Sequence, residues 1–129
     1  MPGKRRVSDI YFPPRELAVM SVLWRLGSAT VSDVRDALEE DLAYTSVLSA
    51  LQTLEEKGHV RHEAEGRAHR YFPLVEAERA GGSALARVRD AIFQGSAERM
   101  FAQMVADRRL SRKELERMRQ LLAKRLGEK

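Results

Sequence analysis

The sequence of 129 residues contains no cysteine, which excludes disulfides, thiolate metal sites and cysteine catalysis. No apolar run approaches the roughly 18 residues of a membrane-spanning helix, and no signal peptide is visible, so we expect a soluble, cytoplasmic protein. Nucleophile–base sets, phosphate-binding loops and HExxH zinc motifs are also missing. We therefore expect no enzyme, no cofactor and no metal site.

The excess of positive charge is small, with 23 basic and 19 acidic residues for a net charge of +4. That balance is too mild to indicate nucleic-acid binding by itself, but its distribution is uneven. Lys4, Arg5 and Arg6 form a basic cluster near the start, whereas residues 39–41 are all acidic. The length allows one domain with a modest core, or a small domain plus a segment that completes its core in a partner.

Residues 44–57 predict a helix with two chemically different sides. At about 100° per residue, its apolar side chains share one side. The opposite arc carries Thr45, Ser46, Ser49, Gln52, Thr53, Glu56 and Lys57. A helix in the major groove must keep carboxylates away from phosphates and present short donors and acceptors to base edges. The acidic residues here occur only in the last turn, as such a helix requires. The alternative is that Ser and Thr are simply favoured near a helix start.

A short hairpin is predicted after this helix. Lys57-Gly58 ends the helix with a cation and a glycine, and residues 60–63 and 68–72 then form two strands around residues 65–67. If the turn centres on Glu65-Gly66, Val60 lies opposite Tyr71. Two helices predicted earlier in the chain complete the order of elements.

The arginines of this hairpin suggest an anionic partner. In the expected register Arg61 lies opposite Arg70, and two opposed arginines repel unless an anion such as phosphate lies against them. Arg67 at the tip is placed to reach the DNA backbone or a minor groove. The alternative is an exposed hairpin kept soluble by its charge, to which Glu63 and Glu65 also contribute.

All three histidines fall in the same segment. The expected register places His62 opposite His69, which invites a metal-binding or pH-sensing hypothesis. Two ligands without a third make a poor metal site, and His59 should point to the opposite face. Histidines that face phosphates are the preferred interpretation.

Two further helices are predicted upstream, over residues 15–26 and 31–40, the second opened by a Thr30-x-x-Asp33 capping box. The order helix, helix, helix, hairpin is that of a winged helix-turn-helix over residues 13–75, a mainly α fold with a small β-hairpin. Residues 1–12 are expected to form a flexible basic arm, which either reaches DNA or is a plain disordered tail.

Residues 76–129 are predicted to form a separate helical segment, with helices over 76–94, 97–106 and 112–126. The last is opened by a Ser111-x-x-Glu114 capping box. Three apolar stripes should be buried in each other and in a second copy, and the alternative is an autonomous bundle in a monomer. The stripes are Leu85, Val88, Ile92 and Phe93; Met100, Phe101, Met104 and Val105; and Leu115, Met118, Leu121, Leu122 and Leu126.

Several motifs in this order closely resemble the BlaI/MecI/CopY penicillinase-repressor family. The resemblance extends to Leu110-Ser111 and Glu114-Leu115 and covers about residues 16–126. The motifs are LAVMSVLW (17–24), ATVSDV (29–34), LAYTSV (42–47), LEEKG (54–58) and EGRAHRY (65–71).

The resemblance implies a homodimeric transcriptional repressor that binds an operator dyad through a reading helix, residues 44–57, and a wing, residues 59–72, and that dimerises through its C-terminal helices. Carried over, it places DNA contacts at Tyr44, Thr45, Ser46, Ser49, Thr53 and Arg67, to which the hairpin adds Arg61 and Arg70. Tyr44 lies at the edge of the packed side, so we expect it to span the boundary, with its ring packed and its hydroxyl toward a phosphate.

The chain departs from its relatives where repression would be lifted. The β-lactam-responsive members are cut at an Asn-Phe bond, and the matching pair here is Gln103-Met104; the cysteine cluster of the copper-responsive members is absent. The inducing signal and any regulatory protease are therefore not indicated. Two alternatives remain: a regulator with a small effector bound between the C-terminal helices, near Phe93, Met100, Phe101 and Met104, and a winged helix used only for protein contacts.

Overall fold

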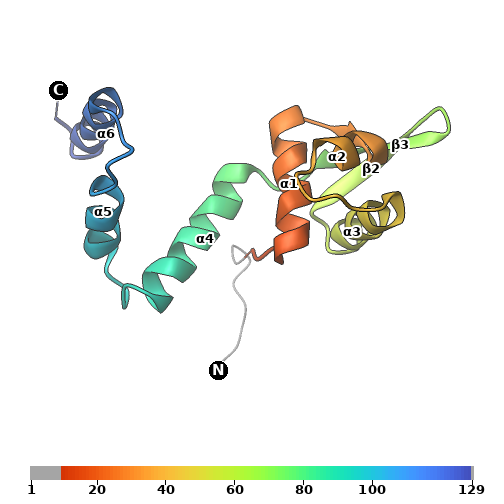
Figure 1. Cartoon of the computed structure of the whole chain (residues 1–129). Helices are drawn as coiled ribbons and strands as arrows, with labels where there is room; N and C mark the ends of the chain where they lie inside the picture. Colours follow the sequence, from red (N-terminus) through yellow and green to blue (C-terminus); the bar gives the residue numbers. More distant parts are fainter. Residues whose placement is uncertain (1–9, 129) are drawn as a thin grey trace. The chain divides into compact units, whose positions relative to one another are not determined.

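The computed structural model describes residues 10–128, and most of the predicted N-terminal arm, including its basic cluster, lies outside them. The described chain divides into two compact units whose boundary falls between Leu85 and Ala86. In chain order the elements, shown in Figure 1, are α1 (Pro14–Leu26), β1 (Ala29–Thr30), α2 (Val31–Ala37), α3 (Tyr44–Glu56), β2 (Val60–Glu65), β3 (Ala68–Pro73), α4 (Ala77–Ala91), α5 (Ala97–Val105) and α6 (Arg112–Arg125).

The first unit packs α1, α2 and α3 with a three-stranded antiparallel sheet in the order β1-β3-β2. Its core is fully apolar, and among the most deeply buried side chains are Met20, Leu23, Leu51, Leu54 and Tyr71. On α3 the buried positions recur at helical spacing, so one side of the helix is committed to the core and the other is left for solvent. The predicted winged helix-turn-helix is confirmed.

The start of α2 follows the predicted capping box. The Thr30 hydroxyl accepts from the Asp33 amide at 3.2 Å, and the Asp33 carboxylate accepts from the Thr30 amide at 3.1 Å. The predicted end of this helix is wrong, because α2 stops at Ala37 and Leu38 is extended. Three consecutive acids follow it, and negative charge at a helix C-terminus opposes the helix dipole.

The strand β1 was not predicted. Ala29 pairs with Tyr71 and Thr30 with Arg70, so the wing has a third strand on its inner edge. Two residues are too few to show a strand periodicity, and only the fold brings them beside β3.

The predicted register of the hairpin is wrong. Arg61 lies opposite Phe72, His62 opposite Tyr71 and Glu63 opposite Arg70. The turn centres on Gly66-Arg67, because Gly66 has a φ of 62° and a two-residue hairpin turn of type II′ needs its glycine in the first central position. The turn lies one residue later than predicted, which shifts each partner on β3 by two positions.

The last residues of the predicted arm are part of the core. Ile10 and Phe12 are only 5% and 6% exposed, so the expectation of a flexible arm is wrong for residues 10–12. The Ile10 amide donates to the Ser83 hydroxyl at 3.3 Å, and the ring of Phe12 meets Trp24 edge-on. The prolines and cations of this segment favour a flexible arm. The burial of two apolar side chains instead fixes residues 10–12 against the core.

The core of the first unit also continues beyond residue 75. Val75 and Ala80 are buried, and the Trp24 indole donates to the Val75 carbonyl at 2.7 Å. The first turns of α4 therefore complete this unit, and the compact unit reaches further along the chain than the predicted domain limit. The proposed division of the chain at residues 75 and 76 stays a prediction.

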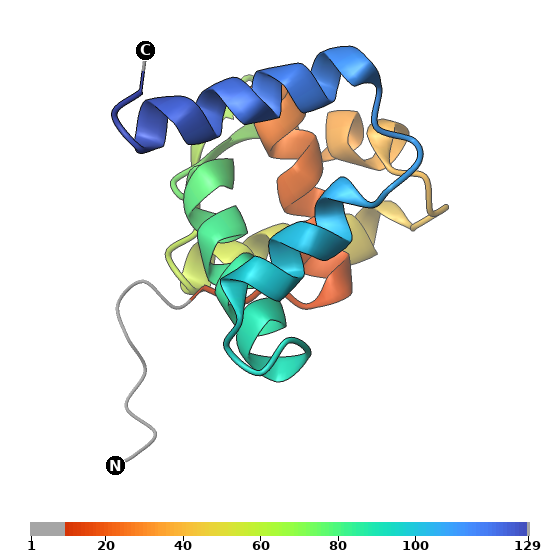
Figure 2. The ribbon, with the colours of Figure 1, turned by 90° about the vertical axis from the view of Figure 1, so that its left-hand side faces the viewer.

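The second unit contains the end of α4 together with α5 and α6, which a short loop joins (Figure 2). Ser96 caps α5, and the predicted Ser111–Glu114 capping box opens α6. Neither α5 nor α6 has a buried residue. Among residues 10–128 no helix has the length and apolar character needed to cross a membrane.

Candidate nucleic-acid interface

The polar side of α3 lines an open groove. Thr45, Ser46, Ser49 and Thr53 form one wall, and Arg15 and Glu16 from the first turn of α1 form the other. Because the first turn of α3 carries no acidic residue, the wall formed by α3 presents hydroxyl groups and no carboxylate. Short hydroxyl donors and acceptors suit contacts to base edges and phosphates.

Arg15 is a member of this groove that sequence reasoning missed. It lies 53% exposed at the start of α1, with its guanidinium 3.6 Å from the Glu40 carboxylate. Across the same groove Lys57 holds the Glu16 carboxylate at 3.0 Å, so the nearby acid is paired with a cation. No local pattern marks Arg15, because only the packing of α1 against α3 brings it here.

Tyr44 is partly exposed at the start of α3. Its side chain is 42% exposed, and the Arg35 guanidinium lies 5.9 Å from the centre of its ring. With Gln52, Arg67 and His69 it lines a second, smaller groove between α3 and the tip of the wing. The expected placement of Tyr44 across the boundary, with its hydroxyl toward a phosphate, stays a prediction.

The three wing arginines have different surroundings. Arg61 pairs with Glu63 at 2.6 Å, and its guanidinium stacks over Phe72, 4.2 Å from the ring centre. Arg67 is exposed in the turn, and within the described residues no carboxylate engages it. The argument from two opposed arginines fails with the register, whereas Arg67 keeps its predicted place at the tip.

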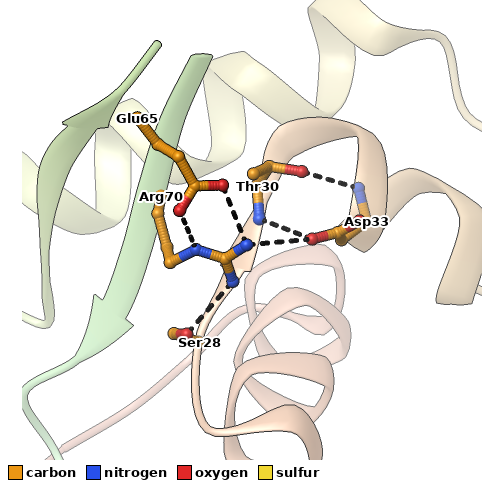
Figure 3. Close-up of polar contacts among 5 residues, drawn as sticks. All are labelled: Ser28, Thr30, Asp33, Glu65 and Arg70. Carbon is orange, nitrogen blue, oxygen red and sulfur yellow. Dashed lines mark hydrogen bonds and ion pairs between the residues drawn. The ribbon is translucent and has the colours of Figure 1, made fainter.

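Arg70 is engaged on several sides by the protein itself, as Figure 3 shows. Its Nε and Nη2 donate to the two oxygens of Glu65 at 2.7 and 3.0 Å, and its Nη1 donates to the Ser28 hydroxyl at 3.2 Å. The Asp33 carboxylate lies 3.9 Å from Nη2. The hydrogen bonds with Arg70 hold the pKa of Glu65 below its ordinary value, and the pKa of Asp33 is lowered chiefly by the Thr30 amide.

The histidines are separated by the fold into two settings. His62 Nδ1 lies 2.7 Å from the Glu55 carboxylate on α3, and the His62 and His69 rings stack 4.3 Å apart although they are diagonal rather than opposite in the register. His59 packs edge-on against Phe12, with ring centres 4.9 Å apart. In the described part of the chain, no three histidine or carboxylate groups are arranged to hold a metal ion.

The setting of His59 predicts a pH dependence of stability. Burial lowers the pKa of His59 from its ordinary 6.5, and the nearby Lys57 charge lowers it further. Near pH 6.5 the unfolded chain therefore binds more protons than the folded one, so stability falls as the pH drops below about 6.5 towards the folded pKa. Urea unfolding is expected to show lower stability at pH 5.5 than at pH 7.5.

His59→Gln is expected to reduce this difference, because glutamine does not titrate. Asp33 and Glu65 do not contribute in this range, since the stability from a lowered carboxyl pKa is lost only at more acidic pH. His69→Gln, at an exposed position, serves as the matched control. An equal pH dependence in His59→Gln and the unaltered chain would contradict the assignment.

The sequence model described as penicillinase repressor matches residues 12–124. The chain belongs to the penicillinase repressor family. The resemblance noted from the sequence motifs is thus confirmed, and the family is one of transcriptional repressors and not of enzymes.

Two relatives of this penicillinase repressor family member match it over part of the chain. The transcriptional regulator BlaI of Mycobacterium tuberculosis is 47% identical over 62 residues, which cover 46% of this chain and 45% of the relative. The match therefore spans less than half of that curated relative. The solved DNA-binding domain of the repressor BlaI aligns with a TM-score of 0.49 and 26% identity, over 59% of this chain and 93% of that domain.

A longer structural match is found with a MarR family protein from Bacillus stearothermophilus. It has a TM-score of 0.51 at 17% identity and covers 94% of this chain and 77% of the other. At this level of identity the match shows a shared fold.

Proposed function

We propose that this penicillinase repressor family member is a homodimeric, cytoplasmic repressor that binds an operator dyad through α3 and the wing, residues 59–72. The observation that carries the proposal is the two-sided character of α3. Leu51 and Leu54 are fully buried on one side, while the other side lines an open groove with hydroxyl groups and carries no acid in its first turn. A solvent-facing helix without function is more often rich in Glu and Lys.

Base contacts and phosphate contacts come from different elements, α3 and the wing. Thr45, Ser46, Ser49 and Thr53 contact base edges, with Tyr44 at the edge of the same surface. Arg61 and Arg67 contact phosphates from the wing. Arg70 is left out of this set because Glu65 binds its guanidinium through two hydrogen bonds and its side chain is only 29% exposed. Arg61 makes one hydrogen bond, to Glu63, and is 47% exposed.

Dimerisation is supported by the apolar side chains that the second unit leaves exposed. Ile92, Met104 and Leu122 are 60%, 50% and 46% exposed, and a stripe of this kind is costly in water unless a partner covers it. A second copy brings two reading helices to a fixed separation, which a dyad of two half-sites matches. The proposed dimer contacts are Leu85, Val88, Ile92, Phe93, Phe101, Met104, Leu115, Met118 and Leu122.

Footprinting of the full chain over the promoters next to its own gene tests this function. We expect a protected dyad, and Arg67→Ala is expected to weaken binding to that dyad and to unrelated duplex alike while reducing the slope of log affinity against log salt by about 0.9. Gln120→Ala, on the exposed surface of α6, is the matched control. No protected site, and no measurable affinity for any duplex at low salt, would contradict the proposal.

A further inference from the structure

The outer half of the wing has little apolar support. In β2 only Val60 is buried, and the five residues that follow it are exposed. In β3 the buried position is Tyr71, which lies on the side of the hairpin nearest the core. Hydrophobic burial therefore fixes the base of the hairpin, while the turn that carries Arg67 extends beyond it.

A side chain of β3 links the turn end of this hairpin to the start of α2, separately from the His62–Glu55 pair between β2 and α3. Arg70 binds Glu65 through two parallel hydrogen bonds, and Glu65 is the last residue of β2 before the turn. The same guanidinium reaches Ser28, just before β1, and Asp33 in the first turn of α2 (Figure 3). The two-pronged contact of a guanidinium with a carboxylate fixes direction as well as distance, which a lysine cannot do.

The helix end of this link is itself held in place. Asp33 accepts from the Thr30 amide in the capping box at 3.1 Å, so its carboxylate is oriented before Arg70 reaches it. Thr30 is also the backbone partner of Arg70 between β1 and β3. Because the carboxylates of Glu65 and Asp33 are about half exposed, at 52% and 49%, the link contributes little to the overall free energy of unfolding, and its effect is on the position of the wing.

We propose that Arg70 is a positioning residue, which through Glu65, Ser28 and Asp33 holds the wing against the start of α2 so that Arg67 meets DNA in register with α3. The inference rests on the proposed function of DNA binding. It adds a role for Glu65, Ser28 and Asp33, none of which is proposed to contact DNA. It also implies that Glu65, although acidic, favours binding to an anionic partner.

A direct contact between Arg70 and phosphate predicts the opposite sign for one substitution. If Arg70 bound DNA, Glu65→Gln would release its guanidinium, remove a negative charge from the interface and tighten binding. If Arg70 positions the wing, Glu65→Gln breaks the link and weakens binding despite that charge change. Glu63→Gln is the matched control, because it removes the same charge from the wing but Glu63 pairs with Arg61 instead.

The experiment measures the affinity of the full chain for the footprinted dyad and for a random-sequence duplex at several salt concentrations. Glu65→Gln and Arg70→Gln are expected to weaken dyad binding several-fold, whereas Glu63→Gln is expected to leave dyad binding equal or tighter. In an Arg67→Ala background the Arg70→Gln effect should largely disappear, because the wing then has no tip contact to position. Tighter binding by Glu65→Gln, or an Arg70→Gln effect that keeps its full size in the Arg67→Ala background, would overturn the inference.

A measurement without DNA separates this inference from the proposed function. Amide hydrogen exchange over residues 61–72 is expected to speed up in Glu65→Gln and Arg70→Gln, with exchange in α1 and α3 unchanged. Unaltered exchange in the wing refutes the positioning role, even if the protein binds DNA well. Failure of the unaltered chain to bind any duplex refutes the proposed function, even if the wing amides respond as expected.

Discussion

A shortened chain that ends at Leu85 is expected to bind a two-half-site operator about 10²- to 10⁴-fold more weakly than the full chain, because it loses the second reading helix held at a fixed separation. Gel-shift titration on the dyad measures the loss, and sedimentation of both chains shows whether it accompanies a change from dimer to monomer. The cut is placed at Leu85 because Val75 and Ala80 belong to the core of the first unit.

The same loss is expected in the full chain from Leu122→Glu, which places a carboxylate within the apolar stripe of α6, where Leu122 is 46% exposed in the single chain. Gln120→Glu puts the same charge on another side of α6 and is expected to bind as the unaltered chain does. A duplex with a single half-site should bind the full and shortened chains about equally. Equal affinity of both chains for the complete dyad would refute the dimer argument.

Leu51→Ala and Ser49→Ala are expected to separate stability from base preference within one helix. Leu51 is fully buried, so its truncation should cost about 2–5 kcal/mol of unfolding free energy through lost burial and a cavity. That is a large part of the roughly 5–15 kcal/mol that stabilises a typical domain. Urea unfolding measures the loss.

Ser49→Ala is expected to leave stability unchanged or slightly raised, because Ser49 is exposed and alanine is the better helix former. Its effect should be a relaxed preference at one base pair of each half-site, of about 1–3 kcal/mol, measured on operators with single base changes. If Ser49→Ala lowered affinity for every sequence equally, Ser49 would be a backbone contact. If it destabilised the fold as Leu51→Ala does, the assignment of faces on α3 would be wrong.

Much of the candidate interface could be predicted because its signals are local. The two sides of α3 follow from helical periodicity. The start of α2 follows from Thr30 and Asp33, which lie three residues apart and form the capping box of its first turn. The family was likewise evident from short motifs in order. In each case the residues that indicate the structure lie within a few positions of one another. The local preference of these segments agrees with the fold that they adopt.

Several of the remaining features depended on residues far apart in the chain. The sequence by itself determined a two-sided helix over α3, a hairpin after it and a helical C-terminal segment, because hydrophobic periodicity and turn residues are local signals. Only the tertiary structure decided that Ile10 and Phe12 enter the core, that β1 joins the wing, and that Arg70 faces Glu65 and Asp33. The conformation of Gly66 shifted every partner in the hairpin, and packing across the fold chose the partners of each charge.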